Sequence, residues 1–361
     1  MKTNKNIRKS ATLLFIACCT QLVAQDQMVY ASIKGGEKST ELSVDEMVNT
    51  YNSRGVQKIG FKDYNGAIAD FDIAIKLNPE YQEGYYNRGL AKYYANEFAA
   101  AINDFNASNS IESTSQAYYF KAKANQHLGK LDQAIGDYSK SIGLNETSVD
   151  AYYSRGGAYF EMKNYANAVN DYNEVIKLDE NFANAYNDRG SAKRQLNDLR
   201  GAMDDYNKAI MHNPKFAASY NNIGSVKRKM GDLDGAIAEY TKAIDLDAKY
   251  AIAFNNRGSV KFEKGDYDAA KDDFTKAIDI NSDYFYAYNN RATAKFKLKD
   301  FSGAEEDCTK AIAINSEYAL AYLNRGNARE VLQNTKLACE DWHIAASLGA
   351  RVPDTHTRNC E

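Results

Sequence analysis

The stretch Ala253-Phe254-Asn255-Asn256-Arg257-Gly258-Ser259-Val260-Lys261 decides the fold, because variants of it recur along most of the chain. Each variant has an aromatic residue and, four places later, a Gly or an Ala. An Ala and a second aromatic residue follow, again four places apart from each other. Residues four apart lie on the same face of an α-helix. The pattern therefore predicts two helices per unit, packed together through these positions.

The unit is 34 residues long, with one unit of 33, and nine units cover residues 48–349. We number each unit so that the first aromatic residue is position 4. The small residue at position 8 is Gly55, Gly89, Ala122, Gly156, Gly190, Gly224, Gly258, Ala292 and Gly326. The Ala at position 20 is Ala67, Ala101, Ala134, Ala168, Ala202, Ala236, Ala270, Ala304 and Ala338. Position 24 is Phe71, Phe105, Tyr138, Tyr172, Tyr206, Tyr240, Phe274, Cys308 and Trp342. A small buried residue is expected at Cys308, where the other units have a ring.

In this pattern the chain resembles the tetratricopeptide repeat family, whose units are 34-residue helix–turn–helix hairpins with the same signature. The proline that the family has near the end of each repeat survives only at Pro79 and Pro214. The resemblance implies an all-α, right-handed α-solenoid (superhelix) of about nine 34-residue helix–turn–helix repeats over residues 43–349. Such hairpins cannot bury their apolar faces alone and must stack on their neighbours.

Two further positions carry opposite charges. Position 7 is basic in every unit except the sixth, which has Ile223, and position 23 is always acidic. Since position 7 points in the same direction as position 4, we expect an Arg–Asp bridge between the two helices of each unit. We interpret these arginines as stabilising residues rather than as ligands for a partner.

Local signals mark the ends of helices and one irregular place. Ser43 and Glu46 have the spacing of a capping box for the first helix. Gly231-Asp232 and Gly265-Asp266 predict the end of one helix and the cap of the next. The second unit is one residue short and has a polar end, so we predict a local distortion near residues 106–116. Residues 25–42 are predicted to be a flexible linker, and residues 350–361 a short C-terminal tail.

Residues 1–24 have the features of a secretory signal: a basic start, an apolar run and a small residue at Ala24. The apolar run is shorter than the roughly 20 residues that span a bilayer. This predicts export across the inner membrane to the periplasm or to the outer membrane or cell surface. The alternative is a lipoprotein signal with Cys18 as the lipid-carrying residue, which would be the only membrane attachment. Cys339 and Cys360 could form a disulfide in such an oxidising compartment, with two free thiols as the other possibility.

The predicted binding surface consists of positions 2, 5, 6, 9, 12 and 13 of the first helix, on the side opposite the second helix. In the family that this chain resembles, this face lines the interior of the superhelix, a concave groove, and binds peptides or partner segments. An Asn at position 6 suits an extended ligand, because its amide both donates and accepts hydrogen bonds; its recurrence as a common repeat residue is the alternative. The candidate groove residues are Tyr86, Asn87, Tyr93, Tyr119, Tyr153, Phe160, Asn187, Arg194, Asn221, Asn222, Arg228, Asn256, Phe262, Asn290, Phe296 and Asn324.

These observations favour a non-enzymatic scaffold for protein–protein interaction, whose partner is a peptide or protein segment. We expect an acidic or polar part of the ligand at Arg194 and Arg228, with apolar anchors on either side. A glycan- or cell-wall-binding module that uses the aromatic groove is the alternative. No catalytic, metal or phosphate-binding motif occurs in the sequence, so we expect no cofactor and no metal. The net charge of −3 argues against nucleic-acid binding.

Overall fold

The computed structural model describes residues 42–353 and residue 360, and the regular secondary structure of this part is entirely helical. Eighteen helices alternate as A and B helices of nine hairpins, which confirms an all-α solenoid of about nine helix–turn–helix repeats. The predicted signal of residues 1–24, with Cys18, and the linker up to residue 41 lie outside the described residues. No helix of the described part is both long and apolar enough to cross a membrane.

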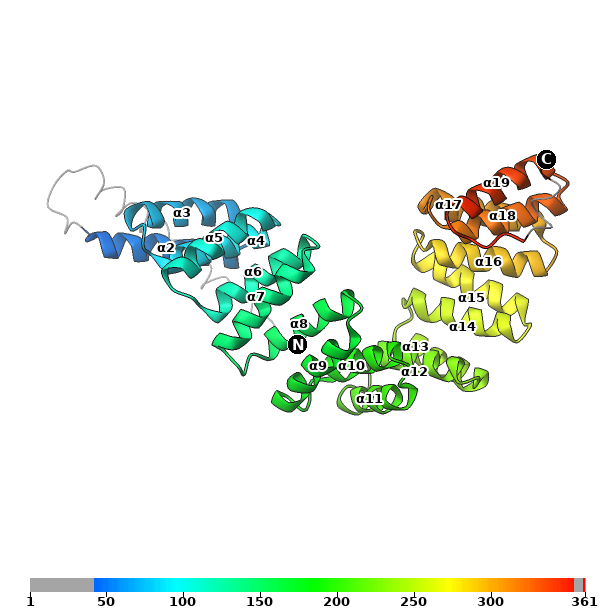
Figure 1. Ribbon diagram of the computed structural model, residues 1–361, viewed down its shortest axis with the longest axis horizontal. Helices are drawn as coiled ribbons and strands as arrows, with labels where there is room; N and C mark the ends of the chain where they lie inside the picture. Colours follow the sequence, from blue (N-terminus) through cyan, green and yellow to red (C-terminus); the bar gives the residue numbers. More distant parts are fainter. Residues whose placement is uncertain (1–41, 354–359, 361) are drawn as a thin grey trace, which may run out of the picture. The chain divides into compact units, whose positions relative to one another are not determined.

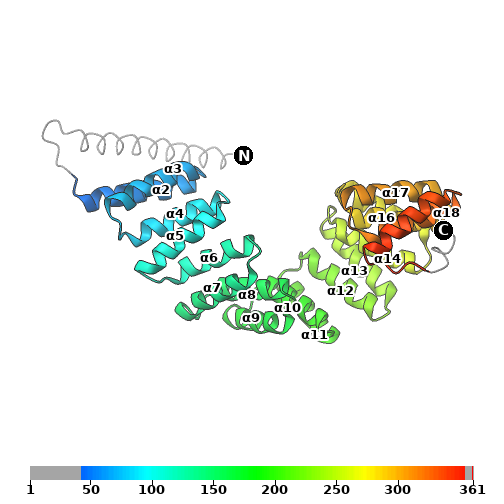
Figure 2. The same ribbon diagram turned by 45° about the horizontal axis from the view of Figure 1, so that its top comes forward.

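The helices fall into two compact units, divided after Leu178. Figures 1 and 2 show the helices of both units, coloured along the sequence. Unit 1 contains repeats 1–4: α2 (Val44–Gly60), α3 (Tyr64–Leu77), α4 (Gln82–Tyr94), α5 (Phe98–Ile111), α6 (Ser115–His127), α7 (Leu131–Leu144), α8 (Val149–Glu161) and α9 (Tyr165–Leu178). Unit 2 contains repeats 5–9: α10 (Ala183–Gln195), α11 (Leu199–His212), α12 (Ala217–Lys229), α13 (Leu233–Leu246), α14 (Ala251–Glu263), α15 (Tyr267–Ile280), α16 (Phe285–Lys297), α17 (Phe301–Ile314), α18 (Ala319–Val331) and α19 (Thr335–Ser347). The even-numbered helices are the A helices and the odd-numbered ones the B helices.

Within each unit, every A helix packs on its own B helix, and each B helix packs on the next A helix. The ring at position 24 is buried against the small residue at position 8, as the sequence pattern predicts. A Cβ added to Gly258 would come within 2.9 Å of Cε1 of Phe274, which is closer than ordinary van der Waals contact. Glycine at position 8 therefore lets the two helices of a hairpin approach each other.

Two neighbouring glycines of α8 test this packing. Gly156 faces the ring of Tyr172, and a Cβ there would lie 2.9 Å from Cε1, whereas Gly157 has nothing within 4 Å. We expect Gly156→Ala to destabilise the fold by about 1–3 kcal/mol through overpacking. Gly157→Ala should stabilise it by about 0.5–1 kcal/mol through helix propensity. Denaturant unfolding of the two variants checks this pair, and equal effects at both positions would contradict the packing.

The helix ends follow the predicted signals. Ser43 and Glu46 form the capping box of α2. Gly231 has φ of 85° between α12 and α13, a conformation that favours glycine. The side chain of Asp232 then accepts a hydrogen bond from Gly235 N and caps α13.

The irregularity predicted near residues 106–116 is a shortened connection between α5 and α6, and it leaves helix α5 intact. Helix α5 has 14 residues, like the other B helices of repeats 1–8, and its polar end is accommodated in the helix. Ser108 is buried and accepts a hydrogen bond from Gln82 Nε2 at 2.7 Å. The missing residue falls instead in the connection between α5 and α6, where Thr114 caps α6. A loop absorbs a deletion more easily than a helix, because a loop has no register to keep.

The C-terminal tail is attached to the last repeat. A disulfide joins Cys339 of α19 to Cys360, with the two Cα atoms 5.4 Å apart. Val352 and Cys360 pack against the buried side chains of Cys339 and Trp342. The apolar side of repeat 9 around Trp342 is thus partly covered by residues of the tail.

Candidate functional site: the face of the A helices

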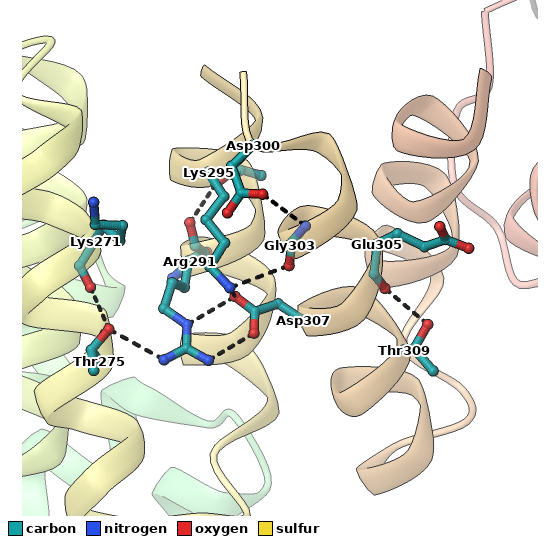
Figure 3. Close-up of polar contacts among 11 residues, drawn as sticks. Lys271, Thr275, Arg291, Lys295, Asp300, Gly303, Glu305, Asp307 and Thr309 are labelled. Atoms are coloured by element: carbon teal, nitrogen blue, oxygen red, sulfur yellow. Dashed lines mark hydrogen bonds and ion pairs between the residues drawn. The ribbon is translucent and has the colours of Figure 1, made fainter. Parts of the chain in front are cut away.

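The position-7 arginines are bound in bidentate ion pairs within their own repeats, as predicted. In repeat 8, Arg291 Nε and Nη2 donate to the two carboxylate oxygens of Asp307 at 2.8 and 2.7 Å (Figure 3). Arg54, Arg88, Arg155, Arg189, Arg257 and Arg325 make the same contact with the acidic residue of their repeat. These arginines are therefore part of the packing between helices A and B and are not free to bind a partner.

The sequence analysis missed a second cation at the same carboxylate. Lys295 Nζ lies 2.9 Å from Asp307 Oδ2, from position 11 of the A helix. Position 11 is also basic and paired in repeats 1, 2, 5, 6, 7 and 9, through Lys58, Lys92, Lys193, Lys227, Lys261 and Arg329. The sequence contains the signal, since position 11 follows position 7 by one helical turn. Repeats 3 and 4 have Asn125 and Tyr159 there instead.

The same arginines also reach the preceding repeat. Arg291 Nη1 donates to Thr275 Oγ1 on α15 at 3.2 Å, so its guanidinium bridges α15 and α17 (Figure 3). Equivalent bonds join Arg88 to Asp72, Arg155 to Ser139, Arg257 to Thr241 and Arg325 to Thr309. Repeat 6 lacks this bond, because Ile223 is aliphatic, and its acidic residue Glu239 pairs with Lys227 at 2.8 Å.

The asparagines at position 6 form hydrogen bonds between neighbouring repeats. Asn256 Nδ2 donates to Asn221 Oδ1 at 2.9 Å, from position 6 of one repeat to position 5 of the repeat before it. The same bond joins Asn87 to Asn52, Asn222 to Asn187, Asn290 to Asn255 and Asn324 to Asn289. One donor of each amide is thus used inside the protein. The second donor and the remaining lone pairs are the groups that a ligand backbone can engage.

The aromatic candidates of unit 1 pack against one another. Tyr93 is buried, and its ring meets those of Phe98 and Phe120 edge to face. The rings of Tyr86 and Tyr119 lie against Phe105 and Tyr138, and those of Tyr153 and Phe160 against Tyr172 and Tyr165. Sugar stacking needs exposed ring faces, so this arrangement does not favour the glycan-binding alternative.

The two arginines predicted to hold an acidic ligand differ in their surroundings. Arg228 donates to Glu263 Oε1 of the next repeat, so its charge is already balanced. Arg194 has no carboxylate within ion-pair distance in the described part of the chain, and its buried Nε has no hydrogen-bond partner. Of these two arginines, only Arg194 is therefore without a carboxylate partner in the described part of the chain.

Repeats 7–9 expose a row of large apolar side chains that the sequence analysis did not select. Ile252, Tyr286 and Leu320 occupy position 2 of α14, α16 and α18 and are 47%, 48% and 48% exposed. Positions 2, 6, 9 and 13 share one helix face. The apolar row at position 2 therefore borders the asparagines at position 6, which we call the asparagine row. Phe262 and Phe296, at position 12, border a pocket farther along the same helices. We call positions 2, 6, 9, 12 and 13 of the A helices of repeats 5–9 the A-helix face of unit 2.

The described residues contain no candidate metal site. Among residues 42–353 and 360, no group of three His, Cys, Asp or Glu side chains is placed to hold a metal ion.

The chain belongs to the tetratricopeptide repeat family. Family models described as tetratricopeptide repeat match residues 60–108, 149–182, 183–216, 251–284 and 285–318. A model described as TPR repeat matches residues 127–163 and 224–265. Together these matches cover more than half of the chain. Proteins of this family are typically non-catalytic interaction scaffolds.

Two solved structures with TM-scores above 0.5 show the same fold. A tetratricopeptide repeat protein from Parabacteroides merdae is 19% identical, with a TM-score of 0.54 over 70% of this chain and 98% of that one. PilF of Pseudomonas aeruginosa is also 19% identical, with a TM-score of 0.52 over 60% of this chain and 96% of that one. The MamA protein matches 48% of this chain and 95% of its own at 25% identity, with a TM-score of 0.45. No curated protein matches this chain.

Proposed function

We propose that the chain is a non-enzymatic scaffold that binds an extended segment of a partner protein along the A-helix face of unit 2. The exposed row of Ile252, Tyr286 and Leu320 carries this proposal, because large apolar side chains stand half-exposed at the same position of three successive A helices. A bound segment would bury this row and meet the free amide groups of the asparagine row beside it.

The charges of the face indicate the polarity of the segment. Arg194 supplies a cation without a carboxylate partner at one end of the unit. An acidic side chain of the ligand would balance this charge. The segment is thus apolar where it meets repeats 7–9 and acidic where it meets repeat 5.

Substitutions on the A-helix face of unit 2 are expected to weaken binding of a peptide ligand without unfolding the protein. A random peptide library displayed on phage, selected on the purified full chain, supplies the ligand, and calorimetry gives its affinity. Ile252→Ser combined with Leu320→Ser, and separately Arg194→Glu, should each weaken binding by roughly tenfold or more, the effect of losing about 1.4 kcal/mol.

Met211 on α11 provides the matched control, because it is a B-helix residue outside this face and is 68% exposed. Met211→Ser should leave the affinity unchanged. Selected peptides that bind all three variants as tightly as they bind the unchanged protein would refute this location of the site.

The chain is further proposed to act outside the cytoplasm, in the periplasm or attached to the outer membrane or cell surface. Two observations support this: the secretory pattern of residues 1–24 and the Cys339–Cys360 disulfide, a bond typical of oxidising compartments.

A further inference from the structure

Repeat 8 lacks the ring that fills the centre of other hairpins. In repeat 7, the ring of Phe274 is buried against Gly258. The corresponding residues of repeat 8 are Cys308, Ala292 and Ala304, which are all small and all buried. The added methyl of Ala292 replaces only a small part of a six-membered ring.

A pocket of about 240 Å³ occupies this place. Ala292, Ala304 and Cys308 form part of its wall, and Phe262 and Phe296 stand at position 12 of α14 and α16 beside them. Burial raises the pKa of the Cys308 thiol to about 12, so the thiol is uncharged at neutral pH. The inner wall is therefore apolar and has the residues that surround a ring in a neighbouring repeat.

The opening of the pocket lies on the A-helix face. Thr293, Asn324 and Asn327 line it from positions 9, 6 and 9 of their helices, and Lys297 lines it from position 13 of α16. Lys297 is exposed, and no carboxylate of the described part lies within ion-pair distance of it. The pocket thus combines an apolar interior with an unpaired cation at its edge.

We infer that this pocket receives an aromatic side chain of the partner segment, next to an acidic residue that pairs with Lys297. The partner's ring takes the place of the ring that repeat 8 lacks. This inference rests on the proposed function, and it adds a recognition element of stated chemistry: an aromatic residue beside Asp or Glu.

The chain's only tryptophan reports on the pocket. Trp342 Nε1 donates to Asn327 Oδ1 at 3.1 Å, and Asn327 lines the pocket. The indole N–H therefore gives a single NMR signal next to the site. The probe is the blocked dipeptide acetyl-phenylalanyl-aspartyl amide, which we expect to shift this signal with a dissociation constant on the order of 1 mM. Acetyl-seryl-aspartyl amide should leave the signal unchanged.

Filling the pocket should abolish the shift. The double variant Ala292→Gly with Cys308→Phe recreates the Gly258–Phe274 arrangement of repeat 7, and Cys308→Met fills the space without changing Ala292. Both should raise the dissociation constant of the probe by at least about tenfold, whereas Cys308→Ala, which enlarges the pocket, should preserve binding. Lys297→Glu should weaken the aspartyl probe and leave its asparaginyl analogue unaffected.

The outcomes separate this inference from the proposed function. If the phenylalanyl probe shifts the indole signal no more than the seryl probe does, or binds the folded Cys308→Met variant equally well, the pocket does not receive a ring. Library peptides that still depend on Ile252 and Leu320 would then leave the scaffold proposal standing. Loss of that dependence, with the probe still bound at the pocket, would instead count against the extended site alone.

Discussion

Arg155→Met is expected to destabilise unit 1 by about 3–5 kcal/mol, because it leaves the carboxylate of Asp171 buried without a cation. Arg155 Nη2 lies 2.7 Å from Asp171 Oδ1, and the Asp171 side chain is only 6% exposed. Tyr159 stands where most repeats have a second cation, so nothing replaces the lost charge. Hydrogen exchange of α8 and α9 measures the loss where it occurs.

Arg257→Met in repeat 7 is the matched control. Asp273 has the same pairing with its arginine, but Lys261 Nζ also lies 2.8 Å from Asp273 Oδ2. The remaining lysine keeps the carboxylate paired, so the loss should be less than half of that for Arg155→Met. Equal losses in the two repeats would mean that the second cation contributes nothing.

The pH dependence of Arg155→Met has a definite sign. Burial raises the pKa of Asp171 above its usual value in the folded protein, while Arg155 lowers it. Without the arginine, the pKa of Asp171 rises further, and the folded state takes up a proton that the unfolded state releases. The cost of the ionised carboxylate therefore decreases as the pH falls. The difference in stability between the variant and the unchanged protein should be larger at pH 8 than at pH 5.

Loss of the Cys339–Cys360 disulfide is expected to destabilise repeat 9 by about 3 kcal/mol, because the bond closes a loop across a sequence separation of 21 residues. The double variant Cys339→Ser with Cys360→Ser should release the tail and expose the cluster around Trp342. Red-shifted tryptophan emission and faster hydrogen exchange in α19 measure this effect, and exchange in unit 1 should not change.

Cys308 serves as the internal reference for the state of the thiols. In protein isolated from the cell envelope and unfolded without reductant, Cys308 should be the one thiol among Cys308, Cys339 and Cys360 that reacts with iodoacetamide. Alkylation of all three would remove the support that the disulfide gives to a location outside the cytoplasm.

The fold could be predicted from the sequence because every repeat has the same residue types at the positions where its two helices pack. Positions 4, 8, 20 and 24 recur with a fixed spacing, and the Arg–Asp pairs follow from the helical period alone. The irregularity predicted near residues 106–116 lies in the loop after α5. The sequence located it but did not specify its form, because the number of residues does not show whether a helix or a loop absorbs a deletion.

The binding face was predicted less well, because exposure depends on packing between repeats. Helical geometry places Asn256 on the face but does not show that its amide already bonds to Asn221. It groups Arg194 with Arg228, although only Arg228 has a carboxylate partner, Glu263. The pocket beside Cys308 could not be predicted, because it depends on how much of the space between the helices the side chains fill. The spacing of residues in the sequence does not give that volume.

Ile223 has a consequence for how the chain can be rearranged. In other repeats, the arginine at position 7 donates a hydrogen bond to a hydroxyl or carboxylate of the preceding repeat, so that repeat must have a polar side chain at the matching place. Ile223 instead packs in an apolar cluster with Tyr206 and Val226, where the preceding repeat must supply a surface of matching shape and no hydrogen-bond acceptor for this side chain. Duplication or shuffling of modules at the junction between α11 and α12 therefore requires one matched polar contact fewer, and the contacts left to match include those of Ser219 and Asn222 with Asn187.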